Sequence, residues 1–166
     1  AGEFTGFVHG TAGTLQAAND ATVVQNAAAG AFTATTIDNE LSALIAAVPT
    51  NVYGKDDLLI YMGTVAYRLY LENQAAAGYQ QLYNMGDGFV PMYNGTKIAV
   101  CPGFPINQLV AAQKSNMFFG TDLVSDTTEL KILNMADLDG SDNVRVVAKF
   151  TGGVQHAWGS DIVLSD

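Results

Sequence analysis

Charged residues are scarce in this sequence, and basic residues are the scarcest. Asp, Glu, Lys and Arg make up 14% of the 166 residues, against roughly a quarter in ordinary globular domains. Seven residues are Lys or Arg and sixteen are Asp or Glu, giving a net charge of −9. No basic cluster occurs. Because gripping phosphates requires several basic contacts, we expect neither specific nucleic-acid binding nor attachment to an anionic membrane surface.

Cysteine is limited to Cys101, so no intramolecular disulfide can form. Cys101 stands between Val100 and Pro102 at the end of an apolar run, which favours a packed structural thiol over a nucleophile. The two histidines, His9 and His156, have no Cys, Asp or Glu at ligand spacing, so no zinc site is expected.

Other chemical motifs are also missing. The acidic segment 137–142 resembles the start of a calcium loop, but the twelfth position, where such a loop needs a glutamate, is Ala148. We therefore expect a solvated hairpin turn there. No phosphate-binding loop, nucleophile elbow or nucleotide fingerprint occurs. We expect no cofactor, no metal and no catalytic residue, and hence no enzyme.

Long apolar runs are lacking as well. No stretch of eighteen apolar residues occurs, so no membrane-spanning helix is expected. No basic segment followed by an apolar one opens the given sequence, so we expect no signal peptide in it.

Apolar residues nevertheless make up 49% of the chain, enough for one domain with a buried core. We expect part of a surface so poor in charge to be buried, most simply by contact with partner subunits. Asn, Thr and Gly also make a soluble surface, so this inference stays open.

The stretch 36–100 carries the firmest structural pattern. Apolar residues at helical spacing predict a helix over 36–48, ended by Pro49, and a second helix is predicted over 64–77. The unbroken apolar run 58–62 predicts a strand covered on both faces. The turn pair Asn94-Gly95 precedes a strand at 96–100.

Strands and turns dominate the rest. We predict a short helical turn at 109–112, a strand at 117–123, and further strands at 129–135, 144–150, 154–158 and 162–164. The expected fold class is α+β. A central sheet of strands 58–62, 96–100 and 117–123 is flanked by the two helices, and a β-ribbon is formed by 129–150 and 154–164.

The connection 79–95 is rich in large side chains. It either folds back over the core or meets a partner subunit, because Tyr, Phe and Met are favoured at interface cores. The candidate inter-subunit contact residues are Tyr83, Met85, Phe89, Met92 and Tyr93.

Three stretches of the C-terminal part carry a family resemblance. They are Asn-Met-Phe-Phe-Gly-Thr-Asp-Leu-Val-Ser-Asp at 116–126, Glu-Leu-Lys-Ile-Leu-Asn-Met-Ala-Asp-Leu-Asp-Gly-Ser-Asp-Asn-Val-Arg-Val-Val-Ala-Lys-Phe-Thr-Gly-Gly-Val-Gln at 129–155, and Gly-Ser-Asp-Ile-Val-Leu at 159–164. Together with the order of elements upstream, they resemble the C-terminal part of the major capsid proteins of tailed bacteriophages and prophages, which have the lambdoid-phage capsid fold. The resemblance covers roughly residue 36 to the end.

The resemblance implies a division of the chain into a Gly/Ala-rich, partly extended leading segment (1–35), an axial domain (36–125) and peripheral-domain strands (126–166). Family members also have an N-terminal arm, an extended loop and a long spine helix before the axial domain. Residues 1–35 are too short and too rich in glycine to supply them, so the resemblance implies the C-terminal portion of a longer polypeptide.

The implied function is that of a structural virion subunit, which assembles in the host cytoplasm into the hexamers and pentamers of an icosahedral shell around double-stranded DNA. Its partners would be identical subunits, with scaffold or portal proteins as further candidates. Two alternatives remain: an encapsulin-like compartment shell that holds an enzyme, and an extracellular glycan-binding module that uses the Tyr/Asn-rich loop.

Overall fold

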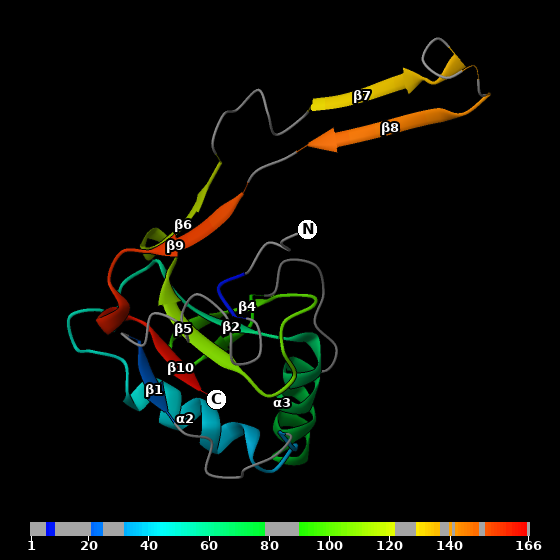
Figure 1. The fold of residues 1–166 in the computed structure, drawn as a ribbon. Helices are drawn as coiled ribbons and strands as arrows, with labels where there is room; N and C mark the ends of the chain where they lie inside the picture. Colours follow the sequence, from blue (N-terminus) through cyan, green and yellow to red (C-terminus); the bar gives the residue numbers. More distant parts are fainter. Residues whose placement is uncertain are drawn as a thin grey trace.

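Strand β2 (Leu58–Met62) lies inside a six-stranded mixed sheet, whose strands follow the order β1-β10-β5-β2-β4-β3 (Figure 1). The other strands of this sheet are β1 (Thr22–Val24), β3 (Met92–Tyr93), β4 (Thr96–Val100), β5 (Leu109–Gln113) and β10 (Val163–Ser165). β2 pairs in parallel with β4 and antiparallel with β5. The computed structural model describes residues 6–8, 21–24, 32–78, 90–121, 129–136, 140, 142–149 and 152–165.

Two helices cover one face of the sheet. They are α2 (Ile37–Ala46) and α3 (Thr64–Ala76), and α3 connects the parallel strands β2 and β4, as a crossover between parallel strands requires. Alternate residues of β2 are buried on this face. The largest fully buried side chains here are Ile37, Leu41 and Leu44 of α2, Val52 of the following loop, Ile60 and Met62 of β2, Leu109 of β5, and Val163 of β10.

A second, smaller cluster lies on the opposite face of the sheet. Its buried members are Val110 and Ala112 of β5, and Ile162 and Leu164 at β10. Strand β5 is covered on both faces: Leu109 and Ala111 belong to the cluster beneath the helices, and Val110 and Ala112 belong to the second cluster. All five residues of β5 are buried.

Two antiparallel ribbons extend from the sheet in series (Figure 1). A 3₁₀ turn, η2 (Lys114–Asn116), leads from β5 into β6 (Met117–Gly120), which pairs with β9 (Gly153–His156). Farther out, β7 (Glu129–Asn134) pairs with β8 (Val144–Lys149). The 3₁₀ turn η4 (Gly159–Asp161) then returns the chain to β10.

The α+β class, the two helices and the strands at 58–62 and 96–100 are confirmed. The Asn94-Gly95 turn is confirmed as well: both residues have positive φ, 45° and 80°, and Tyr93 pairs with Thr96 across them. Positive φ at both central residues is the geometry of the favoured two-residue hairpin turn. The described part of 1–35 includes β1, which pairs in parallel with β10.

Two predictions about the strands were wrong. Residues 109–112 form strand β5 rather than a helical turn, because β5 is covered on both faces and small alanines suit that position. A short apolar run of this kind cannot be assigned by periodicity alone.

The strand predicted at 117–123 does not join the central sheet. It is β6, whose partner among the described residues is β9. Strand β10, which was predicted for the ribbon, instead lies in the six-stranded sheet between β1 and β5.

The pairing predicted between 129–135 and 144–150 is confirmed. Residues 137–139 and 141, in the predicted acidic turn, lie outside the described residues. No helix among the described residues combines the length and apolar character of a bilayer-spanning segment.

Replacing Ile60 with alanine is expected to lower the free energy of unfolding by about 2–5 kcal/mol, because the fully buried side chain leaves a cavity beneath the helices. Urea unfolding followed by circular dichroism measures the change. Ile106→Ala is the matched control, because Ile106 is 56% exposed, and it should shift stability by no more than about 0.5 kcal/mol. Equal effects of the two substitutions would contradict this description of the core.

Candidate functional site

Large apolar side chains are exposed mainly on the two ribbons and at their base. The exposed residues there are Phe118, Phe119, Leu130, Ile132, Leu133, Val144, Val146 and Trp158, with exposed fractions from 40% to 70%. Among the described residues of the body, the large apolar side chains that are exposed are Tyr53, Val90, Met92 and Ile106. Large apolar side chains that share an exposed face are a common feature of interaction sites.

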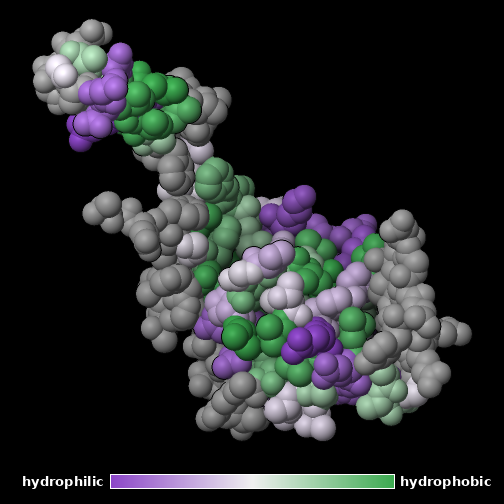
Figure 2. Space-filling view, turned by 90° about the vertical axis from the view of Figure 1, so that its right-hand side faces the viewer, coloured by the Kyte–Doolittle hydropathy of each residue, from purple (hydrophilic) through white to green (hydrophobic). Residues whose placement is uncertain are grey.

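The outer ribbon has two chemically different faces. Antiparallel register pairs Leu130 with Ala148, Ile132 with Val146, and Asn134 with Val144, so these residues share one face. We call the five apolar members of this set the ribbon face: Leu130, Ile132, Val144, Val146 and Ala148. Figure 2 shows hydrophobic and hydrophilic surfaces side by side on the ribbon.

The opposite face of the ribbon includes basic residues. Lys131 pairs with Val147, and Leu133 pairs with Arg145. Val147 is half-buried, whereas Lys131 and Arg145 are exposed. The ribbon is therefore amphipathic, with one apolar face and one partly basic face.

A buried asparagine holds the base of the ribbons. The Asn116 side chain is 5% exposed, and its Nδ2 donates to the carbonyl oxygen of Trp158 at 2.8 Å. Its Oδ1 accepts from the backbone N–H of Ala157 at 3.1 Å and of Trp158 at 2.8 Å. These bonds join the start of β6 to the segment after β9, so they set the direction in which the ribbons leave the sheet.

A carboxylate fastens the end of β5 to the start of β2. Asp57 accepts hydrogen bonds from Nε2 of Gln113, at 2.9 Å, and from Oγ of Ser115. The backbone N–H of Lys114 also donates to the carbonyl oxygen of Asp57, at 3.0 Å. The Ser115 bond and then the Gln113 bond lower the pKa of Asp57 below its ordinary value of 3.8, because both stabilise the ionised form.

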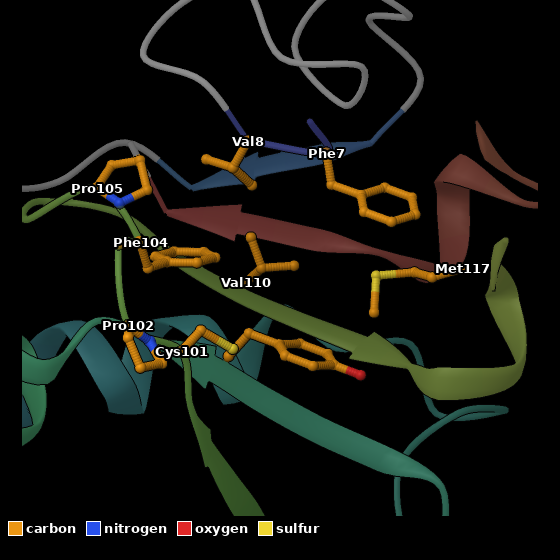
Figure 3. A pocket seen from close by; sticks show the side chains of 10 residues that line it. Phe7, Val8, Cys101, Pro102, Phe104, Pro105, Val110 and Met117 are labelled. Atoms are coloured by element: carbon orange, nitrogen blue, oxygen red, sulfur yellow. The ribbon is translucent and has the colours of Figure 1, made fainter. Parts of the chain in front are cut away.

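An apolar pocket of about 400 Å³ lies on the face of the sheet opposite the helices (Figure 3). Its lining contains no charged side chain: Phe7, Val8, Tyr61, Cys101, Pro102, Gly103, Phe104, Pro105, Val110 and Met117. Burial raises the pKa of the Cys101 thiol, and its Sγ lies 3.8 Å from the carbonyl oxygen of Ala99. A raised pKa lowers the thiolate fraction, so this environment does not activate a nucleophile.

The predicted contact residues fall into two groups. Tyr83, Met85 and Phe89 lie outside the described residues. Met92 and Tyr93 form β3 at the edge of the sheet, and Met92 is 47% exposed. Their role in subunit contacts stays a prediction.

Tyr93 is also used within the chain. Its hydroxyl donates to the carbonyl oxygen of Asp38 at 3.2 Å, and its ring meets Tyr70 edge-on with 6.1 Å between centroids. The Tyr70 hydroxyl donates to the carbonyl oxygen of Met92 at 3.2 Å, and burial raises the pKa of both tyrosines. These contacts tie the edge hairpin to the helices.

Sequence reasoning places Val144, Val146 and Ala148 on one face of a strand, but it assigns no contact role to that face or to the aromatic residues at the ribbon base. The alternation of these residues predicts one apolar side of a strand. No signal in the sequence showed that this side would be exposed. Among the described residues, no group of three or more His, Cys, Asp or Glu could hold a metal ion, and His156 is buried.

Solved structures of viral and virus-like particles contain chains with a similar fold. A chain of Mycobacterium phage Che8 superposes with a TM-score of 0.62 at 13% identity, over 92% of this chain and 55% of that one. A chain from the satellite phage P4 procapsid that includes the size determination (Sid) protein superposes with a TM-score of 0.51 at 14% identity, over 87% of this chain and 43% of that one. A chain of the virus-like particle from Pyrococcus furiosus superposes with a TM-score of 0.53 at 10% identity, over 92% of this chain and 57% of that one.

These similarities concern the fold alone, because the identities are low. The chain spans about half the length of each of these proteins. No protein-family model and no curated protein sequence matches it.

Asn116→Ala is expected to lower the free energy of unfolding by about 1–3 kcal/mol, because the backbone groups of Trp158 lose buried hydrogen-bond partners. Hydrogen exchange should become faster at the backbone amides of β6 and β9. Gln155→Ala, at an exposed position of β9, is the control and should leave exchange in β6 unchanged. Unaltered exchange in Asn116→Ala would show that the asparagine does not hold the ribbon.

Acid is expected to remove a stabilising contribution of Asp57. Because its folded-state pKa is lowered, this contribution is present above the unfolded value near 3.8 and is lost as pH falls through the lowered value. The difference in urea midpoint between wild type and Asp57→Asn should therefore shrink as the pH is taken from neutral to below 3.8. Asp56→Asn, at the exposed neighbouring carboxylate, controls for the loss of one charge, and the same pH dependence there would contradict the assignment.

Proposed function

We propose that this chain is a structural subunit of a viral capsid, which joins identical copies in the hexamers and pentamers of an icosahedral shell around double-stranded DNA. The observation that carries the proposal is the fold, which is shared with chains from a phage, a procapsid and a virus-like particle. In this proposal the protein acts by assembly, is not an enzyme, and resides in the virion after assembly in the host cytoplasm.

The surface chemistry supports a role in assembly. Large apolar side chains stay exposed at 40% to 70% on the ribbons and their base, although the chain has a well-filled core. Contacts with neighbouring copies would bury such surface, and repeated heterologous contacts close into rings. The low charge content then reflects surface that is hidden in the assembled shell.

The domain division follows from the same proposal. Residues 36–125 would include most of an axial domain built on the six-stranded sheet and its helices, and residues 126–166 would include the peripheral outer ribbon. Tyr83, Met85, Phe89, Met92 and Tyr93 would meet their copies near the capsomer axis. Scaffold and portal proteins would be further partners.

The acidic balance suits a wall around DNA. A subunit of net charge −9 does not bind phosphates strongly, so packaged DNA would remain free to move along the wall.

A compartment that holds a protein cargo is the second candidate. The similarity to the virus-like particle from Pyrococcus furiosus supports a shell of this fold without deciding its contents. Genes for DNA packaging beside the parent gene would favour the capsid, and a gene for a cargo enzyme would favour the compartment. A glycan-binding module, the remaining alternative, has no supporting observation among the described residues.

Sedimentation velocity and electron microscopy of the full-length expressed protein test the proposal. The sedimentation coefficient should rise with protein concentration, and micrographs should show rings or closed particles. Gel-shift measurements should show no strong, salt-sensitive DNA binding. A full-length protein that stays monomeric at every concentration would contradict the shell function, and tight DNA binding would contradict the proposed weak interaction between the shell wall and DNA.

A further inference from the structure

We propose that Asn94 is a site of spontaneous deamidation, in which the backbone nitrogen of Gly95 displaces the side-chain amide of Asn94 as ammonia. The site lies in the two-residue turn between β3 and β4. This inference goes beyond the proposed function and does not depend on it, because it follows from the chemistry and the geometry of the turn alone.

The residue after Asn94 leaves the reacting atoms accessible. Asn94 is the only asparagine of the sequence that glycine follows. Because glycine has no Cβ, its backbone nitrogen can approach the preceding side chain without a steric barrier. The surroundings add no barrier: no heavy atom of the described residues lies within 4 Å of the place where a Cβ on Gly95 would stand. Both residues of the turn are exposed.

Other described asparagines lack this combination. Asn39 and Asn73 lie inside α2 and α3, where the helix restrains the backbone. Asn116 is buried, and both ends of its side-chain amide make hydrogen bonds. Asn143 is exposed, but the β-branched Val144 follows it and crowds the backbone nitrogen. Asn143 is therefore a suitable reference for the reactivity of Asn94.

The position of the turn makes the reactive geometry accessible. The turn holds Asn94 at a φ of 45° and Gly95 at 80°, and ring closure requires rotation about the bond between Cα and the carbonyl carbon of Asn94. The turn must therefore open transiently. Strand β3 has two residues and lies at the edge of the six-stranded sheet. Short exposed edge segments open locally at a low cost in free energy.

The reaction balances with water as the only co-reactant. The Gly95 nitrogen loses its proton and bonds to Cγ of Asn94, and the bond from Cγ to the side-chain nitrogen breaks, so that ammonia leaves and a five-membered succinimide ring remains. Water then opens the ring at one of its two carbonyl carbons. Opening at Cγ gives aspartate, whereas opening at the backbone carbonyl carbon gives isoaspartate, in which the main chain runs through the former side chain.

A hollow of about 150 Å³ beside the turn suits this chemistry. Gly95 contributes to its lining, together with Lys55, Asp56 and Lys97. The hollow gives water access to the turn. Because the chain has a net charge of −9, a further negative charge is disfavoured in general, and the two ammonium groups near the turn favour the carboxylate that the reaction forms.

The two products differ in their effect on the hairpin. Aspartate tolerates the left-handed backbone region, so it preserves the turn. Isoaspartate adds one carbon to the main chain within a turn whose two residues are matched to the pairing of Tyr93 with Thr96. It also redirects the Asn94 carbonyl oxygen, which accepts a hydrogen bond from the Tyr53 hydroxyl at 3.4 Å. Isoaspartate should therefore loosen the β3–β4 hairpin.

Incubation in H₂¹⁸O tests the site. The folded protein is kept in mildly alkaline H₂¹⁸O buffer, because loss of the Gly95 amide proton starts the reaction, and is then digested in ordinary water. Mass spectrometry with electron-transfer fragmentation should find aspartate and isoaspartate at position 94, both carrying ¹⁸O, since the label marks conversion before digestion. Position 94 should convert at least about tenfold faster than Asn143, the internal control, because glycine leaves the nitrogen open and valine crowds it.

Hydrogen exchange measures the structural consequence. Chains with isoaspartate should exchange the backbone amides of segment 92–97 at least about threefold faster than fresh protein, because the edge pairing opens more often. Fresh Asn94→Asp should exchange as the fresh wild type does. Asn94→Gly keeps a residue that adopts positive φ and has no side-chain amide, so its exchange should not change with incubation.

Each contrary outcome removes a defined part of the inference. If Asn94 stays intact, or converts no faster than Asn143, the site is overturned. Aspartate formed without isoaspartate would overturn the cyclic intermediate, because direct hydrolysis of the side-chain amide gives aspartate alone. Unchanged exchange in chains with isoaspartate would overturn the effect on the hairpin. These measurements do not involve self-association, so their failure leaves the proposed shell function standing.

Discussion

Burial of one face of the six-stranded sheet beneath α2 and α3 is the constraint on which the rest of the structure depends. Side chains from β2, β5 and α2 are fully removed from water there, and at about 25 cal/mol per Å² of apolar surface such burial is the dominant stabilising contribution in a domain of this size. The second face is covered by fewer buried residues and keeps an open apolar pocket. The helix-covered face therefore provides the rigid base from which the two ribbons extend.

Polar contacts, rather than apolar ones, determine where the ribbons leave this base. The Asn116 side chain satisfies backbone groups of Ala157 and Trp158 across the junction, and Asp57 accepts a hydrogen bond from Gln113 at the end of β5. Beyond that point apolar side chains are exposed on a thin sheet. Among the described residues, the chain is therefore well packed at its centre and leaves apolar side chains exposed on its extension.

Much of the central fold was predictable from local patterns. The helical stripe from Ile37 to Val48 and the apolar run at 58–62 were correct because each pattern reports burial along its own element. The prediction failed at 109–112, where alanines favour a helix by propensity but two covered faces make them a strand. It failed again at 117–123, since the partner of a strand is chosen by residues distant in sequence, here 153–156. For the candidate site, the aromatic loop drew attention through its composition, whereas the ribbon face looked like an ordinary half-buried strand.

The sequence by itself determined the α+β class, the two helices, the Asn94-Gly95 turn and the pairing of the outer ribbon, because periodicity and turn chemistry act over a few neighbouring residues. Its shortage of basic residues also predicts weak phosphate binding, which stays a prediction. Only the tertiary structure decided that β10 returns to the central sheet, that Asn116 is buried at the junction, and that Ile132 and Val146 face outward. Exposure depends on which distant segments lie nearby, and alternation along a strand reports two different faces without stating which of them is covered.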